Sequence, residues 1–135
     1  MNRKEAREFM MQTLFQMEAC NDFDVNNRDN YLTEKVHKSQ RPYCEELFSL
    51  ICNKKEIVDK TVDQYSIGWP SQRMPKTDLA ILRLAACEIL FMQDIPNAVS
   101  INEAVELAKK YGTDESSGYV NGILGKINKD GSIDD

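Results

Sequence analysis

The chain has 135 residues, a formal net charge of −5 and 41% hydrophobic residues. This length suits one domain with a hydrophobic core and is too short for a catalytic domain plus an accessory one. The negative balance weighs against nucleic-acid binding across a broad face, because such binding depends on Lys and Arg side chains that neutralise phosphates. Any nucleic-acid site should therefore be local.

The sequence indicates neither a targeting segment nor a disulfide framework. The first ten residues, MNRKEAREFM, are charged, and no segment approaches the roughly 20 apolar residues of a membrane span. We therefore expect a cytoplasmic protein with no membrane partner. The cysteines form no CxxC pair and have no histidine at ligand spacing, so we expect reduced thiols and no metal site at Cys20, Cys44, Cys52 and Cys87.

Apolar residues recur at helical spacing through the first half of the chain. They predict a helix over residues 3–19, a polar loop over 21–30 and a modest helix over 31–39. A long helix should follow, starting near Pro42 and carrying its apolar stripe through Lys54 to Tyr65.

Glycine and proline punctuate the region after this long helix. Gly68 and Pro70 should end it, and residues 71–75 allow one short turn. The next segment, TDLAILRLAACEILFM at 77–92, is apolar around most of its circumference. Such a helix is expected where other helices surround it, so we predict that it is the central one.

The last third of the chain predicts two more helices joined by a short turn. Ser100 and Glu103 have the spacing of a capping box, which predicts a helix from near Ser100 to about Tyr111. Gly112 can supply the left-handed residue that follows a helix. Residues 113–117 offer N-cap candidates for the final helix, whose apolar stripe is Val120, Ile123, Leu124 and Ile127.

No segment alternates with the period of two that a half-buried strand requires. We therefore predict an all-α fold, a compact single-domain bundle of about six or seven helices over residues 1–128. Residues 129–135 form a short acidic tail without apolar anchors, which should fray.

Residues with catalytic chemistry are sparse in this sequence. The one histidine, His37, has no nucleophile motif beside it, and neither GxGxxG nor GxxxxGK[ST] occurs. Carboxylates at helical spacing are normally solvated or act as caps. We therefore predict a protein that is not an enzyme, with no catalytic residues and no cofactor.

A local basic cluster lies at the amino terminus. Arg3, Lys4 and Arg7 gather there with the terminal amine, although Glu5 and Glu8 dilute their charge. This cluster is the candidate RNA site. The alternative is a helix start whose charges are simply solvated.

Three blocks of the sequence, in order and spacing, resemble the NusB family of bacterial transcription antitermination factors: ILRLAACEIL at 81–90, INEAVELAKKYG at 101–112 and YVNGILGKI at 119–127. RKEAREFMMQTLFQ at 3–16 is similar to the basic amino-terminal helix of that family. The resemblance is weakest between Asn21 and Tyr65. It implies an all-helical, non-catalytic adaptor that binds boxA-type RNA of nascent ribosomal-RNA transcripts. Its implied partners are NusE, a small-subunit ribosomal protein, and the transcription elongation complex.

The resemblance also implies an RNA site on this chain. Arg3, Lys4 and Arg7 occupy the basic motif and would contact phosphates. Phe15 and Tyr119 occupy positions of aromatic residues near the RNA, where a ring can stack on an unpaired base for about 1 to 3 kcal/mol. Core packing is the alternative for both rings.

The implied protein-binding residues are Arg83 and Glu88, as contacts to NusE, and Glu115, near the boundary between RNA and partner. A charge on an otherwise apolar helix must reach solvent, an internal partner or another protein. An internal ion pair is therefore the alternative for Arg83 and Glu88.

The sequence departs from the family pattern at Glu5, which interrupts the basic motif, and at Cys87, Gly118 and Gly125. Three phosphate contacts to a single strand would give a salt slope of about −2, so the isolated chain should bind RNA weakly and need a partner protein. One alternative is a helical protein–protein interaction module with the same fold and little RNA affinity. A homodimer that covers the RNA face is also left open.

Overall fold

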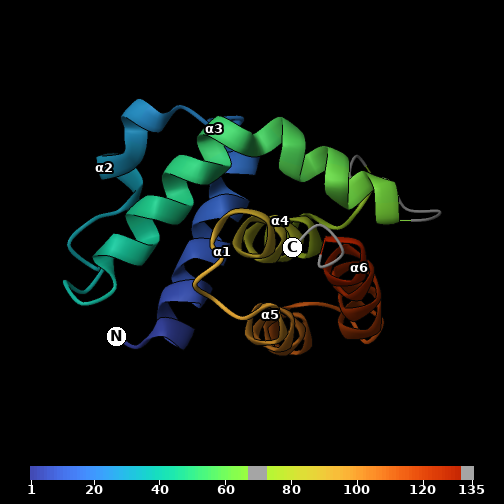
Figure 1. Ribbon diagram of the computed structural model, residues 1–135. Helices are drawn as coiled ribbons and strands as arrows, with labels where there is room; N and C mark the ends of the chain where they lie inside the picture. Colours follow the sequence, from blue (N-terminus) through green and yellow to red (C-terminus); the bar gives the residue numbers. More distant parts are fainter. Residues whose placement is uncertain (67–72, 132–135) are drawn as a thin grey trace.

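The structure is a computed structural model that describes residues 1–66 and 73–131, with side chains up to residue 129. Six α-helices and one 3₁₀ helix follow one another in this part of the chain (Figure 1): α1 (Arg3–Cys20), η1 (Val25–Asn27), α2 (Arg28–Tyr31), α3 (Arg41–Tyr65), α4 (Lys76–Phe91), α5 (Asn97–Tyr111) and α6 (Ser116–Gly131). No strand occurs within the two described ranges. The predicted all-α bundle is therefore confirmed.

Helix α4 is the centre of the bundle, as its all-round apolar sequence predicts. Every residue from Asp78 to Ile89 is buried. Helices α1, α3, α5 and α6 pack around it, with α3 and α5 on opposite sides (Figure 1). The core thus forms where four amphipathic faces meet one apolar helix.

Helix α1 begins with a capping box that its sequence contains at Asn2 and Glu5. The Asn2 side chain accepts a hydrogen bond from the Glu5 backbone N–H at 2.8 Å, and the Glu5 side chain accepts one from the Asn2 N–H at 3.0 Å. The helix ends at Asn21, which adopts the left-handed conformation with φ 50°. Glu5, which interrupts the basic motif, therefore has a structural role as a cap.

The segment between α1 and α3 differs from the prediction. η1 and α2 form within residues 21–30, where the sequence predicts a polar loop, and α2 ends at Tyr31. The predicted helix over 31–39 is wrong, because no regular helix covers residues 32–40. The Asp24 side chain accepts from the Asn26 N–H at 2.9 Å and starts the 3₁₀ turn. Within residues 32–40, the side chains of Leu32 and Val36 are buried in the core. Their burial holds this irregular segment against the bundle.

Helix α3 starts at Arg41 with Pro42 in its first turn, as predicted. It bends at Lys54, whose backbone leaves helical geometry at φ −120° and ψ 16°. The helix ends at Tyr65. The predicted terminators Gly68 and Pro70, and part of the predicted turn over 71–75, lie outside the described residues.

The predicted capping box at the start of α5 is wrong. The helix begins three residues earlier, at Asn97, directly after Pro96. Ser100 lies buried within the first turns, where its hydroxyl donates to the Glu88 carboxylate at 2.7 Å. The Ser100 hydroxyl therefore binds the buried carboxylate of Glu88 on α4 and does not cap α5.

Gly112 joins α5 to α6 in an extended conformation, φ −92° and ψ −167°, and not in the predicted left-handed one. Glycine is required there for space, because a Cβ would lie 2.5 Å from the Cβ of Ser116. Helix α6 then runs to Gly131, so the first residues of the predicted tail are helical. The rest of the tail lies outside the described residues, and its fraying stays a prediction.

None of the helices that the structure describes is long and apolar enough to cross a membrane.

Candidate nucleic-acid interface

The exposed Arg3 side chain is held in place at the start of α1. Its guanidinium lies over the ring of Tyr43, 4.3 Å from the centroid, and its Nε donates to the Gln40 side chain at 2.7 Å. Cation–π stacking and a hydrogen bond thus fix the direction of a charge that faces solvent. Arg3 is positioned to contact a phosphate without first losing much side-chain freedom.

Lys4 is also exposed, with 63% of its side chain accessible. Its Nζ lies 3.3 Å from a carboxylate oxygen of Glu103 on α5. An exposed ion pair of this kind is weak, so solvent or a ligand can compete for the ammonium group.

Arg7 is almost entirely buried at the base of the cleft between α1 and α5, and its expected contact with a phosphate stays a prediction. It is only 3% exposed, and its Nε and Nη2 donate to Glu88 at 2.9 and 3.2 Å. Arg7 follows Arg3 by one helical turn, but the inward face of α1 carries it into the bundle. Of the three basic residues in the predicted cluster, Arg3 and Lys4 remain as surface groups.

Glu88 is the centre of a buried polar network. The residue is 0% exposed, and its carboxylate accepts hydrogen bonds from Arg7, from Ser100 and, at 2.5 Å, from the Tyr43 hydroxyl. These partners lie on α1, α5 and α3, so one carboxylate joins three helices to α4. Burial, together with the adjacent Glu88 charge, raises the pKa of Tyr43 far above its usual range.

Arg83 is held in a second internal network. It is 4% exposed, donates to both carboxylate oxygens of Asp59 at 2.8 and 3.0 Å and donates to Glu18 at 2.6 Å. Burial opposes ionisation of Asp59, but the Arg83 ion pair outweighs it and lowers the pKa of that carboxyl. Arg83 and Glu88 thus form the internal ion pairs that were the alternative for them, and their contact with a partner protein stays a prediction.

Phe15 lies at the surface and is 40% exposed. It borders a hollow of about 360 Å³ together with Gln12, Gln16 and Tyr111. A half-exposed ring beside amide and hydroxyl groups offers a stacking face and hydrogen-bonding groups to an unpaired base. Phe15 is therefore accessible to a ligand, and its stacking on a base stays a prediction.

Tyr119 and Glu115 lie apart from this group, near the start of α6. Tyr119 is half-buried against the core and lines a different hollow, with Tyr65, Gly122 and Lys126. Burial raises the pKa of its hydroxyl, which forms a hydrogen bond with Ser66. Glu115 is exposed.

Two residues of the predicted RNA site, Lys4 and Phe15, lie on one outward face of α1. Lys4, Glu8, Gln12 and Phe15 are separated by four, four and three residues, which places them along one side of a helix. At 1.5 Å per residue this row is about 16 Å long. The spacing is readable in the sequence, although only the structure shows that this side faces outward.

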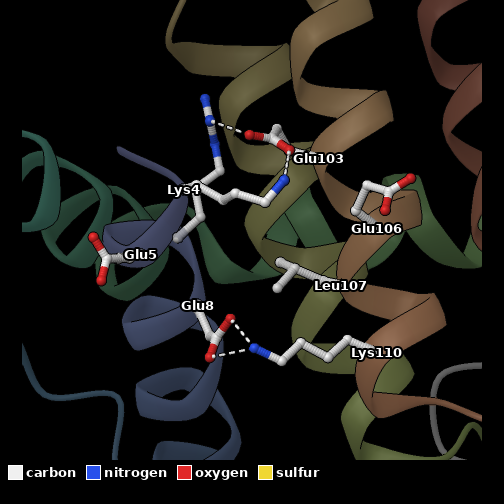
Figure 2. A pocket seen from close by; sticks show the side chains of 8 residues that line it. Lys4, Glu5, Glu8, Glu103, Glu106, Leu107 and Lys110 are labelled. Atoms are coloured by element: carbon white, nitrogen blue, oxygen red, sulfur yellow. Dashed lines mark hydrogen bonds and ion pairs between the residues drawn. The ribbon is translucent and has the colours of Figure 1, made fainter. Parts of the chain in front are cut away.

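Glu8 in that row binds Lys110 and Tyr111 of α5, two residues outside the site predicted from the sequence. Its carboxylate accepts from Lys110 Nζ at 3.0 and 3.1 Å and also from the Tyr111 hydroxyl. These hydrogen bonds, the Tyr111 one most strongly, lower the pKa of Glu8. A cleft of about 290 Å³ lies between α1 and α5. Figure 2 shows Lys4 and Glu103 at one end of it and Glu8 and Lys110 at the other.

Comparisons with known proteins agree with this fold over almost the whole chain. Residues 4–129 match the NusB family. The transcription antitermination protein NusB of Alkaliphilus oremlandii is 46% identical over 127 residues, covering 93% of this chain and 92% of that protein. The NusB protein of Agathobacter rectalis is 43% identical over 130 residues, covering 94% and 99%.

Solved structures show the same likeness. NusB from T. maritima has a TM-score of 0.86 and 35% identity, covering 96% of this chain and 92% of that one. NusB in a crystal structure of antitermination factors NusB and NusE with dsRNA has a TM-score of 0.82 at 22% identity, covering 95% and 96%, and so shares the fold. The chain therefore belongs to the NusB family.

Proposed function

We propose that this chain is a transcription antitermination protein that binds boxA-type single-stranded RNA of nascent ribosomal-RNA transcripts together with NusE. It serves as a non-catalytic adaptor to the transcription elongation complex. Its curated relatives carry the name transcription antitermination protein, and a protein of the same fold has been crystallised with NusE and dsRNA. The observation that carries the proposal on this chain is the outward row of α1, where Lys4 precedes the exposed ring of Phe15, together with exposed Arg3 beside the start of that row.

The proposed RNA site is smaller than the sequence alone suggests. Arg3 and Lys4 contact phosphates, Phe15 stacks on a base, and Arg7 supports the site from inside the bundle. Two phosphate contacts to a single strand give a salt slope of only about −1.4, so the isolated chain binds RNA weakly. NusE then supplies the remaining affinity. Tyr119 and Glu115 mark a second surface, near the start of α6, for RNA or partner contacts.

Fluorescence anisotropy of a labelled boxA-type RNA, with and without NusE, tests this proposal. A scrambled RNA and a duplex of the boxA sequence measure selectivity. We expect selective binding that tightens with NusE and is lost when Arg3→Ala and Lys4→Ala are combined. Lys60→Ala, which removes an exposed cation from α3, should leave binding unchanged.

A second candidate is a helical protein-interaction module that binds NusE but has little RNA affinity. The net charge of −5 and the internal pairing of Arg7 and Arg83 favour it, because both limit the positive charge offered to RNA. NusE binding without any selectivity for boxA RNA would support this candidate and contradict the first.

A further inference from the structure

Glu8 places a negative charge in the middle of the outward row of α1. It lies one turn after Lys4 and about two turns before Phe15, so a strand that runs from the amino-terminal cations to the ring must pass it. Lys110 reaches Glu8 from α5 across the cleft (Figure 2). Tyr111, the next residue, donates to Glu8 and also borders the Phe15 hollow. The Glu8 bridge therefore lies between the two parts of the proposed RNA site.

Besides an ion pair of 3.7 Å between Arg7 and Glu103, two pairs that contain lysines cross this cleft, and these two have opposite polarity. Lys4 of α1 pairs with Glu103 of α5, whereas Glu8 of α1 pairs with Lys110 of α5. Each pair neutralises a cation that lies beside the proposed RNA path. Lys4 and Lys110 keep 63% and 61% of their side chains exposed, so both ammonium groups are accessible from solvent.

We propose that Lys110 is a further phosphate contact of the RNA interface and that Glu8 is its intramolecular competitor. This inference rests on the proposed function and deepens it. In the free protein the Glu8 carboxylate forms an ion pair with the Lys110 ammonium group. When an RNA strand lies along α1, a phosphate replaces the carboxylate as the partner of Lys110. Glu103 competes for Lys4 in the same way at the other end of the cleft.

The two lysine ion pairs are weak enough for an RNA phosphate to replace the carboxylate. Exposed ion pairs contribute little to stability, because both charges are well solvated when apart. A phosphate carries its charge on several oxygens and forms comparable charge-assisted hydrogen bonds with an ammonium group. The exchange then leaves Glu8 without its lysine and close to the RNA, which lowers RNA affinity without blocking the site.

Neutral pH does not relieve this competition. Hydrogen bonds from Tyr111 and Lys110 lower the pKa of Glu8. Its carboxylate therefore stays ionised at neutral pH and becomes protonated at a lower pH than an ordinary glutamate. Removing the charge by substitution is therefore the direct test. Glu8→Gln keeps the side-chain length and an oxygen that can accept from Tyr111, while it releases Lys110.

The experiment measures boxA-type RNA binding by Glu8→Gln, in the presence of NusE, against the wild-type chain. We expect affinity to rise about twofold to fivefold, the range set by an exposed ion pair. The magnitude of the salt slope should rise by about 0.7, the value for one more phosphate contact to a single strand. Glu103→Gln, which releases Lys4 and also removes the 3.7 Å ion pair between Glu103 and Arg7, should act in the same direction.

Two controls separate a released lysine from a general change of charge. Glu56→Gln makes the same change of net charge on α3, across the bundle from α5, and should not alter RNA affinity (Figure 1). Glu8→Gln combined with Lys110→Ala should lose the gain in affinity and in salt slope. Thermal unfolding of each variant checks that the fold is intact.

The proposal is overturned if Glu8→Gln binds RNA no better than Glu56→Gln, or if its gain survives the loss of Lys110. In either case, selective binding that still depends on Arg3 and Lys4 leaves the proposed function standing. If neither the wild-type chain nor any variant binds boxA RNA selectively with NusE, the proposed function and this inference both fail.

Discussion

Ion pairs occur in two regions of this protein and do different work in each. Around Glu88 the charges are buried, and Arg7, Tyr43 and Ser100 satisfy the carboxylate from three helices. Across the cleft between α1 and α5 the pairs of Lys4 and Lys110 lie at the surface, with the lysines largely exposed and their glutamates partly exposed. Burial makes the first set expensive to separate, because an unpaired charge would be left without water. Exposure makes the second set easy to exchange.

This comparison explains why neighbouring basic residues of one motif have different roles. Arg3 and Arg7 are one helical turn apart, and the guanidinium groups of both lie near the ring of Tyr43, at 4.3 and 5.7 Å. Arg3 faces solvent, while Arg7 is bound to Glu88. The first is suited to ligand binding and the second to holding helices together.

The largest expected effect comes from breaking the buried network. Arg7→Ala should lower the free energy of unfolding by about 3 to 5 kcal/mol, because Glu88 would be left as an uncompensated buried charge. Urea denaturation measures this loss. Arg3→Ala is the matched control and should weaken RNA binding with little loss of stability. A stable Arg7→Ala protein that no longer binds RNA would make Arg7 a direct contact after all.

A smaller loss of stability, dependent on pH, is expected at the second buried network. Asp59 has a lowered pKa because it is paired with Arg83, so it stabilises the folded state above the ordinary pKa of aspartate, about 3.9. That contribution is lost as pH falls through the lowered pKa. Asp59→Asn should therefore be less stable than the wild type at neutral pH.

The stability difference between Asp59→Asn and the wild type should shrink in acid. Urea midpoints at pH 7, 5 and 3 measure it, with Glu56→Gln as the exposed control on the same helix. A difference that stays constant over this pH range would show that the Arg83 pair does not depend on ionised Asp59.

Tyr43 connects the two regions, and its substitutions separate them. Tyr43→Phe removes a donor from buried Glu88 and should cost about 1 to 3 kcal/mol of stability. The ring beneath Arg3 remains, so RNA affinity should not change. Tyr43→Leu should weaken RNA binding as well, because Arg3 loses its cation–π partner. Equal RNA affinity of these two variants would mean that stacking does not position Arg3.

The smallest effect on stability is expected for the exposed pair. Lys4→Ala should change the free energy of unfolding by no more than about 0.5 kcal/mol, as surface substitutions commonly do. Its RNA affinity should nevertheless fall, with a salt slope smaller by about 0.7. A large loss of stability would place the Lys4 pair with the buried networks and weaken the comparison.

Much of the helical framework could be predicted from local sequence. The apolar stripe of α1, the proline at the start of α3 and the apolar sequence of α4 each predict the helix that the structure contains. The failures have identifiable causes. Ser100 donates a hydrogen bond to Glu88 and does not cap α5. Gly112 is required because a larger residue would clash with Ser116, and not because the backbone is left-handed there. In both cases a contact between helices outweighs the local rule.

The candidate site could be predicted only in part. Its basic cluster and Phe15 can be found in the sequence, and so can the row that continues from Lys4 to Phe15. Helical spacing places Arg7 on the inward face, three residues before Met10 and seven before Leu14. Its pairing with Glu88 could not be predicted from local sequence, because Glu88 lies on another helix. Lys110 lies in the last turn of α5, where any cation suits the helix dipole, so its position in the sequence does not indicate that it pairs with Glu8.

By itself, the sequence determined the all-α class, the central place of α4 and the family resemblance, because these depend on periodicity and on residue order along the chain. Tertiary structure alone decided which charges face solvent, where they are available to a ligand, and which hold the helices together. The physical reason is desolvation: an Arg, Lys or Glu is identical in sequence whether it faces water or a buried partner. Only the packing of α1 against α4 and α5 determines that Arg7 is paired inside while Lys4 remains at the surface.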